Sequence, residues 1–366
     1  MKKIGVLFGR ESIFPKALID RINEKNVQDV TAEPILIDKV IQGEENGYAV
    51  ILDRISHHVP FYRAWLKHAA LNGAAVVNNP FWSSADEKLV NNELALRASI
   101  AVPKTVLLPS YEHPPHTAGE SFHNLAYPFD WDAIFAYTGF PAYLKPIADG
   151  GWRNVHRVTN REELFAQHAT TGQQVMLLQE EIPFEEYYRC YCIGGQQVRI
   201  MPYDPRRLHH HRYEADFKPS EALEQILIKQ VTRLNQYLGY DFNTVEMAMH
   251  KGIPYAIDFF NPAPDADVHV IGEAHFEWIV ETSAQFLIDK ALAHKPGAEN
   301  LTWGTFLQEV IQPTAPAAPE EKKAPAKKAA AAKPRPPREK AVKEKAVKEK
   351  AVKEKAPAKK KPAEGK

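Results

Sequence analysis

The N-terminal part of the chain alternates between short apolar runs and longer helical patterns, and this alternation leaves few folds open. The apolar runs predict strands at residues 3–8, 33–38, 48–52 and 74–78. Helical patterns cover residues 15–25 and 60–72 between them. Parallel strands need a crossover connection, usually a helix, so strands that alternate with helices build a parallel sheet covered by helices. The sequence therefore predicts an α/β domain with a mostly parallel sheet.

Further along, short strands are joined by tight turns. The predicted strands cover residues 106–108, 140–146, 155–158, 175–181, 187–193 and 197–202, and the last two form a hairpin through Gly194-Gly195. The predicted helices cover residues 86–99, 160–168, 220–238, 276–293 and 303–311. Asn160, with Glu163 three residues later, is typical of a capped helix start. This part of the chain favours antiparallel sheets with helices packed against them.

Residues 244–267 read as a second hairpin, in which carboxylates interrupt apolar strands. Glu246 and Asp258 lie within the two runs, Lys251-Gly252 supplies the turn, and Asn261 follows the second run. A buried carboxylate is costly unless it is paired, and a set of oxygen ligands suits Mg²⁺ together with nucleotide phosphates. The alternative is an edge hairpin whose acids point into water. The stretch alone does not decide between these two interpretations.

The metal reading makes a geometric demand on this hairpin. Side chains alternate along a strand, so Glu246 and Asp258 share a face only if the loop has an odd number of residues or the ladder contains a bulge. We predict such a feature. Asp265 and Asp267 are the alternative ligands if Asp258 or Asn261 faces away.

The neutral net charge of the whole chain hides a split. Residues 313–366 have a net charge of +11 and the rest of the chain −11. This tail is almost entirely Ala, Lys, Pro and Glu and repeats AVKEK three times, so we expect it to be disordered. It is expected either to bind DNA or RNA without sequence preference or to act as a solubilising tether. The composition of the tail favours the tether.

Cysteine use and hydropathy predict the compartment. Cys190 and Cys192 lie two apart in a predicted strand, a spacing too long for an easy disulfide. No apolar run reaches the length of a membrane span, and the N-terminal apolar run is too short for a signal peptide. We therefore expect a soluble, cytoplasmic protein without membrane contacts.

The order of several motifs resembles the ATP-grasp superfamily of carboxylate–amine ligases, which includes glutathione synthetase, D-alanine–D-alanine ligase and RimK-type ligases. The motifs are Asn78-Asn79-Pro80, Asp86-Glu87-Lys88, Val102-Pro103-Lys104-Thr105, Phe140-Pro141 to Lys145-Pro146 with Gly150-Gly151, Gln179 to Ile182, and Arg189 with Gly194-Gly195. Glu246, Asp258 and Asn261 follow where that superfamily has its metal ligands. The resemblance implies a pre-ATP-grasp domain at 1–105, a two-lobed ATP-grasp domain at 106–312 and the tail at 313–366.

The resemblance also implies a role for each site residue. Lys145, Lys88 and the Gly150-Gly151 loop would hold ATP phosphates. Gln179, Glu180, Glu181 and Ile182 would contact the adenine and Glu186 the ribose. Glu246, Asp258 and Asn261 would hold Mg²⁺, or Mn²⁺ in its place, and Arg189, Lys145 and Arg212 would act in catalysis. Taken singly, each has an ordinary structural reading, such as a solvent-exposed lysine or a simple turn, so the order of the motifs carries the resemblance.

The resemblance implies an ATP-dependent ligase that joins a carboxylate, small or peptidic, to an amine through an acyl phosphate. A homodimer is the expected assembly, because dimers are common among such ligases. Two alternatives stay open. The superfamily usually has Glu-x-Asn where this chain has Asp258-x-x-Asn261, so an ATP-binding protein that has lost ligase activity is one of them. A polyanion-binding protein that acts through its tail is the other.

Overall fold

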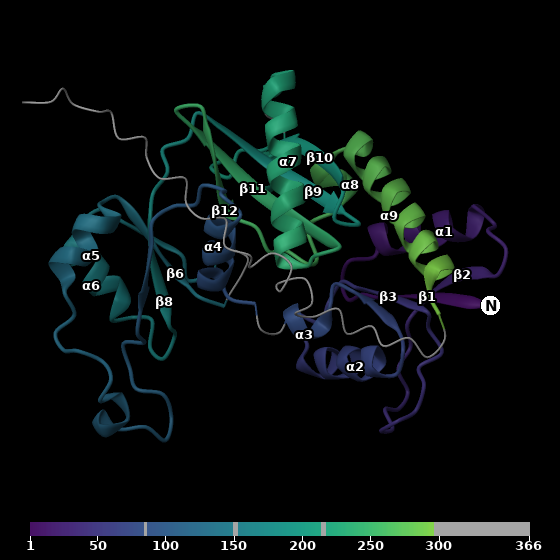
Figure 1. Ribbon diagram of the computed structural model, residues 1–366, viewed down its shortest axis with the longest axis horizontal. Helices are drawn as coiled ribbons and strands as arrows, with labels where there is room; N and C mark the ends of the chain where they lie inside the picture. The colour runs from purple at the N-terminus through teal and green to yellow at the C-terminus, as the bar shows by residue number, and fades with distance from the viewer. Residues whose placement is uncertain (84–85, 149–152, 214–216, 296–366) are drawn as a thin grey trace, which may run out of the picture. The chain divides into compact units, whose positions relative to one another are not determined.

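A computed structural model describes residues 1–83, 86–148, 153–213 and 217–295. In this part of the chain three sheets of four strands each are formed, with helices against them (Figure 1). The predicted helix at 303–311 and the predicted tail at 313–366 lie outside the described residues. The domain boundaries at 105 and 312 stay predictions.

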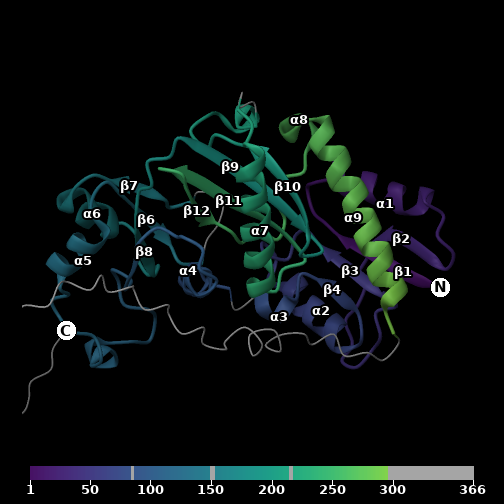
Figure 2. The same ribbon diagram turned by 45° about the horizontal axis from the view of Figure 1, so that its top comes forward.

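The first sheet, here the N-terminal sheet, is parallel with strand order β2-β1-β3-β4. Its strands are β1 (Lys2–Leu7), β2 (Val30–Pro34), β3 (Val50–Asp53) and β4 (Ala75–Val77). Helices α1 (Ile13–Glu24) and α9 (Glu273–Ala293) cover one face and α2 (Pro60–Leu71) the other (Figures 1 and 2). Val50 and Leu52 pack towards α1 and α9 and Ile51 towards α2, as strand alternation requires. The predicted parallel sheet is confirmed.

The strand predicted at 33–38 is shifted, because β2 ends at Pro34. Proline has no N–H to donate to a ladder, so it ends strands readily. The strand begins at Val30, three residues before the predicted start. The Asn23 side chain supports it there, since it donates to the Ala32 carbonyl (3.0 Å) and accepts from the Ala32 N–H (2.9 Å).

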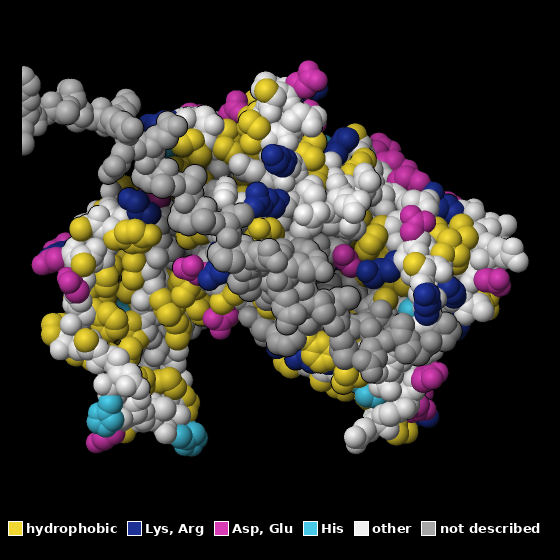
Figure 3. All heavy atoms as spheres, viewed as in Figure 1, with side chains coloured by type: hydrophobic (Ala, Val, Ile, Leu, Met, Phe, Trp, Pro, Cys, Tyr) yellow, Lys and Arg dark blue, Asp and Glu magenta, His cyan; other side chains and the backbone are white. Residues whose placement is uncertain are grey.

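The second sheet, here the lobe sheet, is antiparallel with order β5-β8-β6-β7. Its strands are β5 (Thr105–Leu108), β6 (Ala142–Pro146), β7 (His156–Val158) and β8 (Met176–Glu180). Helices α5 (Trp131–Thr138) and α6 (Arg161–His168) cover one face. Asn160 caps α6 as predicted, whereas α5 was not predicted from the sequence. Figure 3 shows apolar side chains at the surface of this lobe, where Tyr111 and Tyr137 are exposed.

The third sheet, here the central sheet, is antiparallel with order β10-β9-β11-β12. Its strands are β9 (Glu186–Ile193), β10 (Gln197–Pro202), β11 (Phe242–His250) and β12 (Ile253–Asp258). Helices α7 (Glu221–Leu238) and α4 (Lys88–Arg97) pack against one face. The short elements are α3 (Pro80–Ser83), α8 (Val268–Ile271) and the 3₁₀ turns η1 (Gly119–Phe122) and η2 (His209–His211).

The hairpin of β11 and β12 has the bulge that the metal reading demands. Lys251 and Gly252 form a two-residue turn with positive φ angles of 50° and 74°, the backbone of a type I′ turn. Met247 pairs with Ala256, but Glu246 pairs with Asp258, so Ile257 is one extra residue. The two carboxylates therefore lie directly opposite each other, and the predicted bulge is confirmed.

Two smaller expectations concern the cysteines and the membrane. Cys190 and Cys192 are free thiols, both buried, as expected from their spacing. Among the described helices, none combines the length and the apolar character needed to cross a bilayer.

Candidate active site

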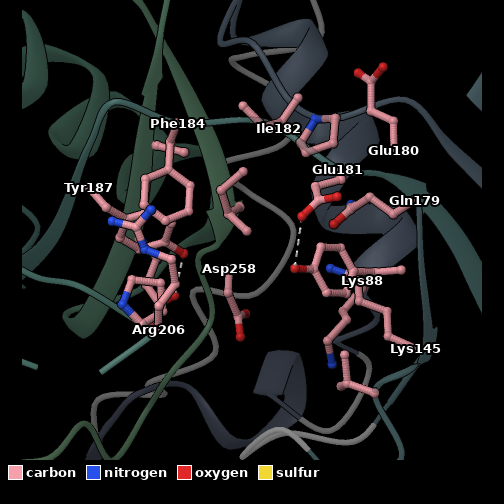
Figure 4. A pocket seen from close by; sticks show the side chains of 17 residues that line it. Lys88, Lys145, Gln179, Glu180, Glu181, Ile182, Phe184, Tyr187, Arg206 and Asp258 are labelled. Atoms are coloured by element: carbon pink, nitrogen blue, oxygen red, sulfur yellow. Dashed lines mark hydrogen bonds between the residues drawn. The ribbon is translucent and has the colours of Figure 1, made fainter. Parts of the chain in front are cut away.

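A cavity of about 290 Å³ lies between the central sheet and the lobe sheet. Eight residues predicted for the site line it: Lys88, Lys145, Gln179, Glu180, Glu181, Ile182, Glu246 and Asp258. They come from α4, β6, β8, the segment after β8, β11 and β12, which are far apart in the sequence. In Figure 4 Asp258 points into the space between Tyr187 and Arg206 on one side and Lys88 and Lys145 on the other. The fold thus brings most of the predicted residues together.

A row of three charged residues crosses the central sheet on the cavity side. Arg189 of β9 is paired in register with Glu246 of β11, which is paired with Asp258 of β12. The Tyr187 hydroxyl donates to Glu246 Oε2 (2.6 Å), and Arg189 Nε lies 3.9 Å from Glu246 Oε1. Burial raises the pKa of Glu246, and Arg189 opposes that rise. Two carboxylates thus share one wall of the cavity.

Two lysines, Lys145 of the lobe sheet and Lys88 of α4, line the same cavity. Along β6, Ala142, Leu144 and Pro146 are buried, so alternation turns Tyr143 and Lys145 towards the cavity. Loss of solvent around its ammonium lowers the pKa of Lys145 to about 8, with Asp258 acting in the opposite direction. Lys88, at the start of α4, also lines the cavity, and its positive charge contributes to lowering the pKa of Lys145. Two ammonium groups and two carboxylates therefore border one space, an arrangement suited to a metal-bound polyphosphate.

Much of the remaining lining of the cavity is apolar. Ile182, Phe184, Tyr187, Ala248 and Ile257 line it. The polar side chains beside it are tied to the protein. Gln179 donates to Thr105 Oγ1 (2.9 Å), Glu180 accepts from the Lys104 N–H (2.9 Å), and Glu181 pairs with Arg157 (2.8 Å). An apolar slot with few fixed polar groups is the usual form of a site for a planar ring.

Several predicted residues do not line this cavity. The Asn261 N–H donates to the side chain of Asn243 (2.7 Å), and Glu186 lies on the other face of β9, where it accepts from the Tyr188 hydroxyl (2.6 Å). This placement gives the ribose and metal roles of Glu186 and Asn261 no support. Asp267 caps α8, and Asp265 Oδ2 lies 3.4 Å from His209 Nε2. Gly150 and Gly151 lie outside the described residues.

The two predicted catalytic arginines do not line the cavity, although Arg189 lies 3.9 Å from Glu246. Arg189 donates to the Tyr213 hydroxyl (3.0 Å), and Arg212 donates to the Tyr203 hydroxyl (3.2 Å). The guanidinium of Arg189 also lies over the ring of Tyr203, 5.5 Å from its centroid. The positive charges of both arginines oppose the rise in the pKa of Glu246 that burial causes.

Three residues of the first domain follow β3 without lining this cavity. The Ser56 hydroxyl donates to Asp53, and the rings of His57 and His58 lie 4.0 Å apart. Loss of solvent lowers the pKa of His57 to about 4, and His58 adds to that effect. The sequence makes Ser56, His57 and His58 candidates for the lining of a substrate pocket, and this role stays a prediction.

Sequence reasoning did not assign Tyr187 and Arg206, which line the cavity, or Asp86, which is not part of its lining. Tyr187 is two residues before Arg189, so strand alternation alone places it on the same face. Arg206 lies over the ring of Phe184 (4.6 Å) and makes two hydrogen bonds to Asp204 (2.8 and 3.0 Å). Burial raises the pKa of Asp86 to about 6, and its carboxylate accepts from Tyr240 (2.9 Å). The contacts of Arg206 with Phe184 and of Asp86 with Tyr240 join distant segments of the chain, so no local sequence pattern indicates them.

The donor set suits Mg²⁺ more than a metal that needs a full protein cage. Within the described ranges, no group of three or more His, Cys, Asp or Glu side chains is arranged to hold a metal ion. Mg²⁺ typically takes one or two carboxylates and completes its shell with phosphate oxygens and water. Glu246 and Asp258 supply such a pair at the cavity wall.

Solved structures similar to this chain include two amino-acid ligases and an ATP-grasp protein. D-alanine–D-alanine ligase from Bacillus anthracis, complexed with ATP, aligns with a TM-score of 0.55 and 16% identity over 80% of this chain and 96% of that chain. A RimK domain ATP-grasp protein from Sphaerobacter thermophilus aligns with a TM-score of 0.55 and 18% identity, over 78% of this chain and 99% of that chain. VanG D-Ala:D-Ser ligase from Enterococcus faecalis aligns with a TM-score of 0.56 and 16% identity, over 79% of this chain and 99% of that chain. No protein-family model and no curated protein sequence matches the chain.

At these identities the likeness is one of architecture. It covers nearly the full length of each similar structure and about four fifths of this chain. The chain therefore has the ATP-grasp fold.

Proposed function

We propose that this protein is an ATP-dependent carboxylate–amine ligase that forms an amide through an acyl phosphate. The observation that carries the proposal is the pair Glu246 and Asp258 opposite Lys145 and Lys88 across one cavity. The names of the similar structures support it, since two of them are amino-acid ligases.

In this proposal the adenine of ATP lies in the apolar slot against Ile182 and Phe184. The phosphates then lie between the two ammonium groups and the two carboxylates, so that Lys145 contacts phosphate oxygens as a point charge. Mg²⁺ held by Glu246 and Asp258 would neutralise phosphate charge and orient the terminal phosphoryl group.

The proposed reaction has two displacements. A carboxylate oxygen of the first substrate attacks the γ-phosphorus of ATP, and the bond to the β-phosphate oxygen breaks to release ADP. The amine nitrogen of the second substrate then attacks the acyl carbon, phosphate leaves with the bonding electrons, and the amine proton passes to solvent. Lys145, Arg189 and Arg212 stabilise the negative charge that moves in the first step. No side-chain nucleophile is needed, so the protein acts by positioning and electrostatics.

Release of ADP tests the proposal. The protein is incubated with Mg·ATP and a panel of amino acids and short peptides, as single compounds and in pairs. We expect ADP and phosphate with at least one carboxylate–amine pair, and at least a 100-fold loss of kcat/KM in the Lys145→Ala variant, since one charged contact in a closed site is worth about 3 kcal/mol. Lys229→Ala on the exposed face of α7 is the matched control and should retain full activity. Unchanged turnover in the Lys145 variant would overturn the assignment.

The position of Asn261 motivates a second candidate function, an ATP-binding protein without ligase chemistry. The superfamily pattern places an amide ligand here, whereas in this chain Asn261 does not line the cavity. Mg·ATP binding without ADP formation across the whole panel would favour this candidate, and turnover with any pair would exclude it.

We further propose that the tail at 313–366 contacts polyanions, which its charge of +11 supports. The full chain should then bind single-stranded DNA with an affinity that falls steeply as salt rises. A chain ending at residue 312 should lose this binding and keep its ATP turnover. DNA binding of equal strength in the shortened chain would contradict the proposal.

A further inference from the structure

The two oxygens of the Glu246 carboxylate have different partners. Oε2 accepts the short hydrogen bond from the Tyr187 hydroxyl (2.6 Å). Oε1 lies 3.9 Å from Arg189 Nε, which is beyond hydrogen-bond distance. Arg189 Nε is itself buried and has no hydrogen-bond partner among the described residues. The carboxylate is thus held close to Arg189 without a hydrogen bond to its Nε.

The position of Tyr187 explains how its hydroxyl reaches this carboxylate. Tyr187 is paired with Ala248, and Arg189 is paired with Glu246, so Tyr187 is the diagonal neighbour of Glu246 across β9 and β11. Diagonal neighbours are within reach of a long aromatic side chain. The ring is 4% exposed and packs against Phe184 (4.9 Å) and Tyr203 (5.9 Å between centroids). Its hydroxyl is therefore aimed by a fixed ring.

We propose that Tyr187 is a positioning residue: its hydroxyl holds Glu246 in the orientation that binds the metal and keeps it from closing onto Arg189. The inference rests on the proposed function, because it assumes that Glu246 binds Mg²⁺ with the nucleotide. Without the hydroxyl, the carboxylate is free to turn towards the Arg189 guanidinium, the basic group that lies 3.9 Å from it within the described part of the chain. A closed Glu246–Arg189 pair would remove a ligand from the metal and a positive charge from the phosphates together.

The chain offers a matched control for this contact. Tyr188 donates to Glu186 Oε2 over the same distance, 2.6 Å, on the opposite face of the same strand. Tyr187→Phe and Tyr188→Phe therefore each remove one tyrosine–glutamate hydrogen bond from β9 and keep the ring. Only the first lies in the cavity wall.

The test measures the dissociation constant of ADP by calorimetry, once with Mg²⁺ and once with EDTA. In the wild type we expect Mg²⁺ to strengthen binding. Tyr187→Phe should lose about tenfold of the affinity with Mg²⁺ and change the affinity in EDTA less than twofold. Tyr188→Phe should change neither value. Mn²⁺ binding in the presence of ADP can be followed by the electron spin resonance signal of the ion. Tyr187→Phe should bind Mn²⁺ more weakly than the wild type, and Tyr188→Phe should bind it equally well.

A second pair of variants tests the competition with Arg189. The substitution Arg189→Gln removes the charge of the arginine. In the Tyr187→Phe background it should restore part of the Mg²⁺ effect on ADP affinity, so the effects of the two substitutions on that affinity would not be additive. Thermal unfolding checks that each variant is folded. If Tyr187→Phe keeps the full Mg²⁺ effect, or Tyr188→Phe loses as much, the positioning role is wrong. If the wild type itself shows no Mg²⁺ effect, the proposed function fails instead.

Discussion

At the scale of single residues, the site depends on a few charges held away from bulk solvent. Glu246 and Asp258 share one wall of the cavity, and Lys145 faces them from another sheet. The sequence showed that carboxylates interrupt apolar strands, which made them candidates for a site. It did not show Asp86 or Arg206, because their contacts, with Tyr240 and Phe184, join segments that are far apart in the chain.

The lowered pKa of Lys145 predicts how nucleotide affinity depends on pH. Its ammonium loses charge above a pKa of about 8, while the phosphates of ADP, with a second pKa of about 6, stay fully ionised. Phosphate prefers the charged lysine, so the affinity for ADP should fall as pH rises from 7 to 9.5, with the fall starting near pH 8. Calorimetry across this range measures it. Lys145→Ala should bind weakly throughout and lack this step, and a step of equal size in that variant would contradict the assignment.

The raised pKa of Asp86 predicts a gain of stability on neutralisation. Burial raises this pKa from 3.8 to about 6, so the folded state holds the proton more tightly than the unfolded state. The cost of ionising Asp86 is therefore absent below pH 4 and complete above pH 6. Asp86→Asn should raise the free energy of unfolding by about 1–3 kcal/mol at pH 7.5 and by much less at pH 4. Urea unfolding at the two pH values measures this, and an equal or lower stability at pH 7.5 would count against it.

At the scale of elements, the hairpin of β11 and β12 shows what sequence reasoning can reach. If the two carboxylates bind one metal ion, they must lie on the same face of the hairpin. Because side chains alternate along a strand, that requirement predicts a bulge from the sequence. The bulge lies at Ile257. The place of Asn261 was beyond prediction, because it follows from Asn243, a buried side chain of another strand. Helix α5 was missed because its aromatic composition, WDAIFAYT, has no strong helix preference.

The side chain of Asn243 should be the main support of the segment after β12. It donates to Asn235 Oδ1 (3.0 Å) and the Phe259 carbonyl (2.8 Å), and accepts from the Asn261 N–H. Asn243→Ala leaves these groups buried without their partner and should cost about 3 kcal/mol of unfolding free energy. Asn160→Ala, which removes an exposed helix cap, should cost about 1 kcal/mol. Urea unfolding compares the two, and equal losses would show that the network adds nothing.

At the scale of the molecule, helix α9 joins the end of the described chain to its start. Ile279, Val280, Leu287 and Ile288 lie in one core with Ile4, Val6, Phe14 and Leu18. The core also contains Tyr191 and Phe242 of the central sheet, so it connects two of the three sheets. The N-terminal sequence predicted the parallel sheet but not that α9 packs against it. The apolar pattern of a helix predicts a buried face but not the surface that this face covers.

The shared core predicts that residues 1–105 do not fold alone. Burial of the four large apolar side chains of α9 contributes about 6–12 kcal/mol, which is comparable to the whole stability of a domain. Circular dichroism should show a fragment of residues 1–105 without cooperative thermal unfolding. A chain ending at residue 312 should unfold within about 2 °C of the full chain, because the tail is expected to bury nothing. Cooperative unfolding of the 1–105 fragment would refute the role of α9.

The central claim is that the cavity between the lobe sheet and the central sheet binds Mg·ATP. A crystal structure with Mg²⁺ and a non-hydrolysable ATP analogue tests it most directly. The account predicts the base against Ile182 and Phe184, phosphate oxygens at Lys145, and Mg²⁺ on Glu246 and Asp258. A nucleotide bound elsewhere, or a metal held by other residues, would contradict it.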